Sequence, residues 1–129
     1  MRYGLTLPCA GEGGDPRTTA ELARLAEESG WDGVFLEDYI VHHSAKDAPT
    51  YDPWVAMAAI ATATSRIRIG TTVTPLPRRR VWKVARETVS LDHLSGGRLT
   101  LGVGLGDAGD PGFGAVGEPT SPLRIAASW

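Results

Sequence analysis

The sequence has a single cysteine, Cys9, so no disulfide bond can form within the chain. Sparse cysteine is typical of a reducing compartment, and we therefore expect a cytoplasmic protein. Long apolar runs are also missing, since none reaches the roughly 18 residues of a membrane-spanning helix. The first seven residues lack the apolar core of a signal peptide. These absences predict a soluble protein that is neither secreted nor embedded in a membrane.

An excess of charge of either sign is lacking too. Thirteen Lys and Arg residues face 15 Asp and Glu residues, which gives a net charge of −2. This balance argues against nucleic acid or an anionic membrane as the main partner. By contrast, 42% of the 129 residues are hydrophobic, which is enough to bury one core. The composition therefore predicts one globular domain.

The clearest strand pattern is IRIGTTVTPLP, residues 67–77. Its alternate residues form an apolar, β-branched face made by Ile67, Ile69, Thr71 and Val73. The opposite face is nearly bare at Gly70 and small at Thr72, so another group could approach its backbone closely. Three arginines, Arg78 to Arg80, follow just before a helical pattern, where cations oppose the helix dipole. This conflict indicates either a functional site or a solvated basic turn.

Strands and helices are expected to alternate along the chain. The strands are predicted at 2–7, 32–38, 67–73 and 99–105, and the helices at 18–29, 53–61 and 81–94. Thr18 and Glu21 have capping-box spacing, and Asp52 with Pro53 form an N-cap and first-turn pair. The segments 8–16 and 107–129 are rich in Gly and Pro and are predicted to be loops, with at most one helical turn near the end of the chain.

A strand–helix repeat of thirty-odd residues predicts parallel strands joined by right-handed crossovers. Ligands bind beyond the carboxyl ends of such strands. The four most unusual stretches lie at these ends: PCAGEGG, EDYIVHH, TPLPRRR and GLGDAGDPG. The connections at the opposite ends are short, and this asymmetry indicates an active-site face.

Four blocks in order resemble the luciferase-like monooxygenases, which use FMN or the deazaflavin F420: GWDGVFLEDY, YDPW, ATATSRIRIGTTVTPLPRRR and LDHLSGGRLTLGVGLG. The resemblance covers about residues 1–120. It implies a TIM barrel, of which this chain would hold four of the eight β/α units. The expected fold is an α/β half-barrel, (β/α)4, over residues 1–106, followed by a loop-like or partly disordered tail over 107–129. The family's main flavin-phosphate site lies in the later half.

The resemblance implies candidate catalytic residues after the second strand. Asp38 and Tyr39 match an acidic–His pair that faces the ring in deazaflavin-using members, with Tyr39 in place of the histidine. A phenol can still donate a hydrogen bond to a reacting oxygen, although a tyrosine packed over the sheet edge is the alternative. His42 is a further candidate. It is adjacent to His43, so the two side chains diverge and form a poor chelate, and no metal site is predicted.

The candidate cofactor-binding residues lie on the third and fourth strands: Gly70, Thr71, Thr72, Val73, Gly102 and Gly104. Their small size would leave room for a tricyclic ring, or would only fill a tight barrel interior. In the family, the strand that matches GTTV often carries a bulge with a non-prolyl cis peptide. We therefore expect a cis bond or a bulge at Thr72–Val73.

Two functions remain open at this point. The first is a flavin- or F420-dependent oxidoreductase or monooxygenase that acts on a small organic substrate. The second is a non-catalytic half-barrel, either truncated or an assembly partner without a cofactor of its own. In both cases the apolar outer strands, from Arg2 to Leu7 and from Leu99 to Leu105, favour a homodimer that closes the barrel.

Overall fold

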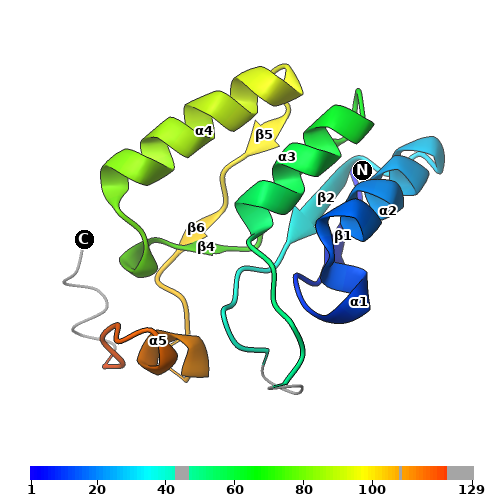
Figure 1. The fold of residues 1–129 in the computed structure, drawn as a ribbon. Helices are drawn as coiled ribbons and strands as arrows, with labels where there is room; N and C mark the ends of the chain where they lie inside the picture. The colour runs from blue at the N-terminus through cyan, green and yellow to red at the C-terminus, as the bar shows by residue number, and fades with distance from the viewer. Residues whose placement is uncertain (43–46, 108, 122–129) are drawn as a thin grey trace.

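The structure is a computed structural model, and it describes residues 1–42, 47–107 and 109–121 (Figure 1). The strands are β1 (Gly4–Leu7), β2 (Gly33–Leu36), β3 (Arg68–Thr71), β4 (Thr74–Pro75), β5 (Leu99–Thr100) and β6 (Val103–Gly104). The helices are α1 (Gly11–Gly14), α2 (Pro16–Glu28), α3 (Pro53–Ala63), α4 (Val81–Ser95) and α5 (Pro111–Ala115), with a 3-10 turn, η1, at Leu76–Arg78. Among the described residues, no helix is both long and apolar enough to cross a membrane.

Four strands form one parallel sheet in the order β1-β2-β3-β5. Leu5 pairs with Val34, Val34 with Ile69, and Ile69 with Leu99. Parallel neighbours need crossover connections, which α2, α3 and α4 supply in turn. The order of strands and helices confirms the parallel α/β fold predicted from the sequence, and it corresponds to part of a (β/α) barrel.

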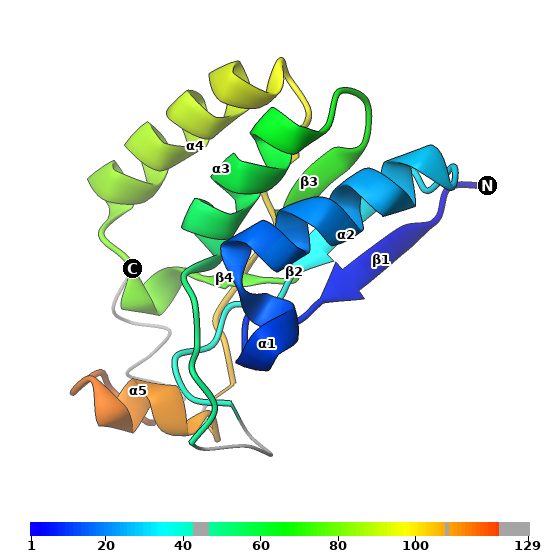
Figure 2. The same cartoon turned by 45° about the vertical axis from the view of Figure 1, so that its right-hand side comes forward.

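The three long helices lie side by side over one face of the sheet, with α3 between α2 and α4 (Figures 1 and 2). Buried side chains fill the layer between them: Val34, Leu36, Ile67 and Ile69 from the sheet, and Ala23, Met57, Ile60 and Leu91 from the helices. β2 is apolar in succession because Val34 and Leu36 pack under the helices while Phe35 covers the opposite face of the sheet. The opposite face of the sheet carries no helix in the described part of the chain.

Local sequence signals set most helix ends. The Asp52 carboxylate accepts hydrogen bonds from Trp54 N–H and Val55 N–H, and Pro53 occupies the first turn, as predicted. Gly96 ends α4 in the left-handed conformation, also as predicted. The prediction of a capping box at Thr18 is wrong. Asp15 caps α2 instead, and Pro16 takes the first helical position, so the helix begins two residues earlier.

The loop predicted over residues 8–16 contains the single-turn helix α1. The N–H of Gly11 donates to the Pro49 carbonyl, and Ala10 bridges Thr50, so a contact distant in sequence holds this turn. The helix α5 lies near the start of the tail, and the helical turn predicted near the end of the chain falls outside the described residues. Asp110 caps α5 by accepting from Gly112 N–H, and Pro111 occupies the first turn.

The third predicted strand ends early, at Thr71, and a second short strand, β4, begins at Thr74, whereas the fourth predicted strand is divided into β5 and β6. The Thr72–Val73 peptide is cis, which confirms the expectation from the resemblance. Beyond it, Val73 is 39% exposed and Thr74 is buried, so the predicted alternation is wrong at these two residues. The division between β5 and β6 falls at Gly102, where an added Cβ would lie 2.1 Å from the Thr71 carbonyl oxygen. The chain crosses β3 too closely there for a side chain.

Phe35 covers the bare centre of the open sheet face. A Cβ added to Gly33, Gly4 or Gly70 would lie 2.8, 2.9 or 3.1 Å from its ring. These three glycines on neighbouring strands therefore leave a space that one aromatic ring occupies. The sequence indicated room for an approaching group at Gly70. In the structure, the Phe35 ring from the same sheet fills that space.

Candidate functional site

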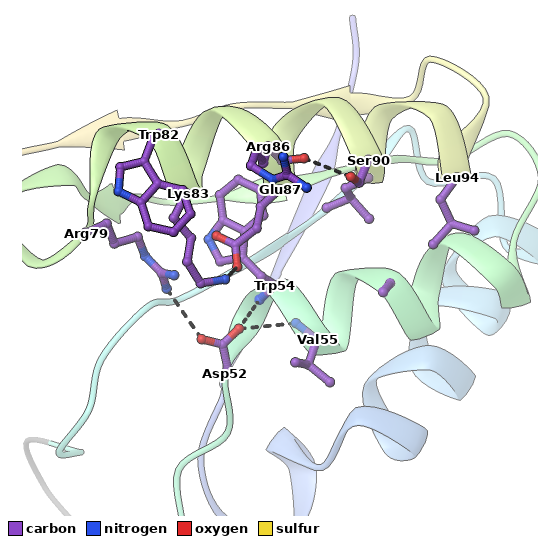
Figure 3. Close-up of a pocket in the computed structure, with 12 residues that line it drawn as sticks. Asp52, Trp54, Val55, Arg79, Trp82, Lys83, Arg86, Glu87, Ser90 and Leu94 are labelled. Carbon is purple, nitrogen blue, oxygen red and sulfur yellow. Dashed lines mark hydrogen bonds and ion pairs between the residues drawn. The ribbon is translucent and has the colours of Figure 1, made fainter.

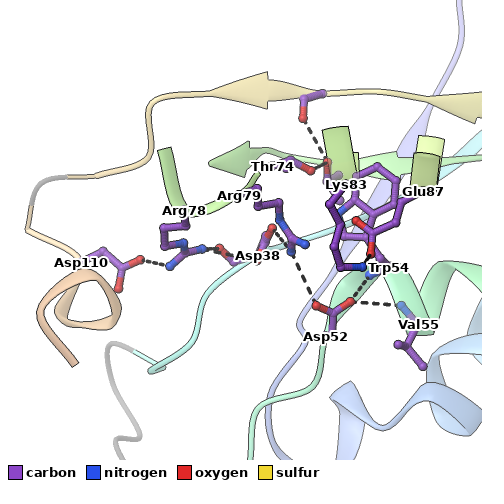
Figure 4. A network of polar contacts seen from close by, with 12 residues as sticks. Asp38, Asp52, Trp54, Val55, Thr74, Arg78, Arg79, Lys83, Glu87 and Asp110 are labelled. Carbon is purple, nitrogen blue, oxygen red and sulfur yellow. Dashed lines mark hydrogen bonds and ion pairs between the residues drawn. The ribbon is translucent and has the colours of Figure 1, made fainter. Parts of the chain in front are cut away.

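The carboxyl ends of the strands hold a buried network of ion pairs built around Asp38 (Figure 4). Asp38 follows β2, and its side chain is 6% exposed. Its carboxylate accepts from Arg79 at 2.8 Å and from Arg78 at 3.3 Å. Arg78 is the last residue of η1 and Arg79 follows it, so the network joins segments that are about forty residues apart in sequence. A buried carboxylate between two guanidinium groups has its charge compensated.

Arg78 continues the network toward the C-terminal segment. Its guanidinium donates to the Asp110 carboxylate at 2.9 Å and lies 5.0 Å from the centre of the Phe113 ring. Arg78 and Asp110 are both almost fully buried, at 5% and 8% exposure of their side chains. This pair attaches α5 to the ends of the strands.

Arg79 links the network to α3. It lies 3.6 Å from the Asp52 carboxylate and 5.8 Å from the Trp54 ring centre. Asp52 also caps α3, so one carboxylate fixes a helix start and borders the network. With Asp38 and Asp110, three carboxylates surround two guanidinium groups. No positive charge is left over in this cluster for an anionic ligand.

Burial raises the pKa of Asp38 above its ordinary value, and the nearby Arg79 and Arg78 act in the opposite direction. Both carboxylate oxygens of Asp38 already accept hydrogen bonds from guanidinium groups. Asp38 is therefore best suited to orienting the two arginines and the residues that follow β2.

Tyr39 lies next to this network, and its hydroxyl donates to the Glu37 carboxylate. Its ring meets the His42 ring edge to face, with 5.3 Å between their centres. Burial, together with the Glu37 carboxylate, raises the pKa of Tyr39. The phenol is thus protonated at neutral pH and donates its single proton to Glu37, so toward a further group the hydroxyl can act only as an acceptor. Of the two adjacent histidines, His43 lies outside the described residues.

A hollow of 290 Å³ opens beside these groups. It is lined by Asp38, Tyr39, Ile40, Thr50, Tyr51, Asp52, Pro53, Arg78 and Arg79. The structure thus brings two predicted catalytic residues, Asp38 and Tyr39, to one cavity with the arginines of the basic turn. Cys9 is buried nearby, and its burial, followed by the negative charges of Asp38, Asp52 and Glu37, raises the pKa of the thiol to about 12. It is inert packing under these conditions.

The predicted cofactor-binding residues lie at the same end of the sheet, but some of them are exposed and others are buried. Thr72 and Val73 are exposed beyond β3, where a planar group could rest on them. Thr71 is buried, and its hydroxyl lies 2.8 Å from that of Thr74 and donates to the Gly102 carbonyl. The assignment of these residues to a cofactor stays a prediction.

The glycines of this region are required by packing within the chain. An added Cβ would lie 2.2 Å from the Thr100 carbonyl oxygen at Gly70 and 2.7 Å from the Val73 side chain at Gly104. Either contact forces a shift of the chain. The sequence analysis identified these glycines but not the Asp110–Arg78 pair. The stretch GLGDAGDPG marked the region as unusual but did not indicate an ion pair.

The fold and this site define an α/β protein of parallel strands with a buried network of ion pairs at their carboxyl ends. A sequence profile of the luciferase-like monooxygenases matches residues 1–126. The chain belongs to this family. Related proteins bind F420 or FMN, as solved complexes show.

Two relatives and one solved structure illustrate the similarity. A 4-hydroxyprotoasukamycin monooxygenase of Streptomyces nodosus subsp. asukaensis is 42% identical over 67% of this chain and 22% of its own. An F420-dependent glucose-6-phosphate dehydrogenase of Beutenbergia cavernae is 38% identical over 72% of this chain and 28% of its own. An F420-dependent secondary alcohol dehydrogenase, solved with an F420–acetone adduct, superposes with a TM-score of 0.79 at 27% identity, over 98% of this chain and 38% of its own. The chain thus spans less than half the length of each.

Proposed function

We propose that this chain provides one part of a site for the ring of F420 or FMN, in an oxidoreductase or monooxygenase that acts on a small organic substrate. The observation that carries the proposal is the position of Asp38 and Tyr39 at the carboxyl end of β2, where the N–H of the exposed Thr72 donates to the Leu36 carbonyl two residues before Asp38. Membership of the family supports it. The relatives are longer, so the activity of a whole enzyme is part of the proposal.

The residues present fit a ring better than a phosphate. Thr72 and Val73 offer an exposed, small surface at the sheet end, on which a planar group can lie. Arg78 and Arg79 are already paired with carboxylates, so neither is available to a phosphate in this arrangement. The resemblance implies that the phosphate site lies in a later part of the barrel. We therefore expect this chain to bind the ring weakly.

The cofactor supplies hydride transfer or oxygen activation when bound. The residues of this chain would orient the reactants. Tyr39 donates its one hydroxyl proton to the Glu37 carboxylate, which fixes the direction of the phenol, so its oxygen would accept a hydrogen bond from the ring or the substrate. Asp38 holds Arg78 and Arg79, which line the hollow beside it.

Fluorescence titration with F420 and with FMN tests this proposal. We expect saturable binding of one of them, weakened about three- to tenfold in Tyr39→Phe, because the variant loses one hydrogen bond and little else. Tyr3→Phe, at the amino end of β1, is the matched control and should bind like the unmodified chain. Absence of a fluorescence change with either cofactor at millimolar concentration would contradict the proposal.

A second function is favoured by the mutual pairing of Asp38, Arg78 and Arg79, which occupies every charged group of the network. Under this alternative the chain is a non-catalytic assembly partner, and the network is purely structural. Freshly purified protein separates the two. Bound flavin or deazaflavin absorbance supports the first function, and a colourless chain that binds neither cofactor supports the second.

A further inference from the structure

The charged side chains that line the 290 Å³ hollow at the strand ends are two carboxylates and two guanidinium groups: Asp38, Asp52, Arg78 and Arg79. Ion pairs join these four groups to one another, and Arg78 also pairs with Asp110. The formal charges of the lining therefore cancel, and Asp110 adds one negative charge behind it. An anionic ligand would lose its water and find no cation without a carboxylate partner. The hollow therefore favours an uncharged ligand.

The hydroxyl groups of the lining belong to Tyr39, Thr50 and Tyr51. A neutral hydroxyl has a single proton to donate. Tyr39 donates its proton to the Glu37 carboxylate, and Thr50 donates its proton to the Ile40 carbonyl at 2.7 Å. The Tyr51 hydroxyl makes no hydrogen bond to any residue that the structure describes. Of these three hydroxyl protons, the one on Tyr51 is therefore free for a ligand.

Backbone contacts on both sides hold Tyr51 in place. Its N–H donates to the Cys9 carbonyl at 2.8 Å, and the preceding residue, Thr50, forms a bridge with Ala10. The following residue, Asp52, caps α3 and so fixes the start of that helix. A partly buried side chain on an anchored backbone loses less freedom on binding than one on a mobile loop. Tyr51 is thus a preorganised hydrogen-bond donor.

Arg79 is the competing donor, because its side chain is 18% exposed and a guanidinium has five N–H groups. One of its terminal nitrogens lies 2.8 Å from the Asp38 carboxylate and 3.6 Å from that of Asp52. Arg79 also lines the larger groove of 770 Å³ between α3 and α4, together with Trp54 and Trp82 (Figure 3). Arg79 is therefore shared between two hollows, whereas Tyr51 takes no part in lining that groove.

We propose that Tyr51 donates a hydrogen bond to an uncharged ligand in the hollow at the strand ends, through an acceptor oxygen such as that of a ketone or an alcohol. The Tyr39 oxygen accepts a hydrogen bond when the ligand carries a hydroxyl group, since the proton of Tyr39 is held by Glu37. That this ligand is the substrate of a flavin- or F420-dependent reaction rests on the proposed function. The binding itself needs no cofactor.

Two probes of the same shape test the donor. Cyclohexanone has an acceptor oxygen, and methylenecyclohexane has a CH₂ group in its place. Titration of the chain without cofactor, followed by ¹H–¹⁵N NMR, gives the affinity for each probe, and the amides of Tyr39, Ile40 and Tyr51 locate the binding. Tyr51→Phe should lower the ratio of ketone to alkene affinity about three- to tenfold, because only the ketone loses a hydrogen bond. A change in the shape of the hollow would lower both affinities together.

Tyr3→Phe, at the amino end of β1, is the matched control and should leave the ratio unchanged. Circular dichroism confirms that both variants are folded. Inorganic phosphate is the charged probe, and it should leave the amides of the hollow unshifted. Phosphate binding in the hollow would overturn the preference for an uncharged ligand.

An unchanged ratio in Tyr51→Phe would overturn the inference and indicate Arg79 as the donor. The inference would also be wrong if the ketone showed no saturable binding, or if it shifted only amides of the α3–α4 groove. Ketone binding that depends on Tyr51, in a chain that binds neither F420 nor FMN, would support the inference and contradict only the proposed function.

Discussion

The carboxylate of Glu27, near the C-terminal end of α2, accepts a hydrogen bond of 2.6 Å from the backbone N–H of Ile67, at the entrance to β3. The same carboxylate also accepts from the N–H groups of Arg66 and Ser65. Burial opposes its ionisation, but these backbone hydrogen bonds outweigh burial and lower the pKa of Glu27 to about 2. One side chain thus fixes a helix to the neighbouring strand at the end of the sheet opposite the site.

Glu27→Gln should therefore destabilise the fold by about 1 kcal/mol at pH 7, a value reduced for the solvent exposure of the carboxylate. Because the folded pKa is depressed, the stabilisation is complete above the ordinary value of 4.5 and is lost as the pH falls toward 2. Urea unfolding of both proteins at several pH values measures this. Glu12→Gln, an exposed carboxylate on α1, is the control. Equal pH dependence of Glu27→Gln and the unmodified chain would refute the prediction.

Arg98 is a buried cation held by oxygen atoms without a formal charge. Its guanidinium donates to the carbonyls of Ala61, Thr64, Ile67 and Ser95 and to the Thr64 hydroxyl. Lysine has fewer donors and cannot satisfy this set, so Arg98→Lys should destabilise the fold by about 2–4 kcal/mol. Thermal or urea unfolding checks this, with the exposed Arg86→Lys as control. A loss below about 0.5 kcal/mol would show that water replaces the guanidinium.

Cys9 should resist thiol reagents in the folded chain. It is fully buried, and the raised pKa of about 12 leaves almost no thiolate at pH 8. We expect modification by a disulfide reagent to be at least about a hundredfold slower in native protein than in urea-unfolded protein, since the unfolded thiol ionises near its ordinary pKa. Rapid native labelling would mean that the loop after β1 opens readily.

Features that depend on neighbouring residues could be predicted from the sequence. Asp52 with Pro53, and Gly96 after α4, set helix ends through side-chain and backbone preferences that act within a few residues. The parallel order of strands followed from their spacing. The start of α2 was misplaced because Asp15 and Thr18 are both good caps, and Pro16 decides between them.

Features that depend on distant contacts could not be predicted. The division between β5 and β6 arises where Gly102 crosses Thr71, a packing relationship that alternation does not reveal. In the site, Asp38 and Tyr39 were identified through the resemblance. The pairing of Arg78 with Asp110 joins residues 32 positions apart, and the Gly-rich sequence around Asp110 gave no sign of a buried ion pair.

Asp110→Asn should release α5 from the strand ends. The variant keeps the acceptor oxygen that caps α5 but removes the charge that compensates Arg78, whose guanidinium is buried at 5% exposure. Arg78 retains Asp38 as a partner, so we expect a loss of about 1–3 kcal/mol in unfolding free energy and not complete unfolding. Limited proteolysis should then cut within residues 109–121 several times faster, because a detached segment is accessible to the protease. Asp107→Asn, three residues earlier and exposed, is the matched control and should be cut at the unmodified rate. Equal cutting of both variants would show that the Phe113 contact with Arg78, and not the ion pair, holds α5 in place.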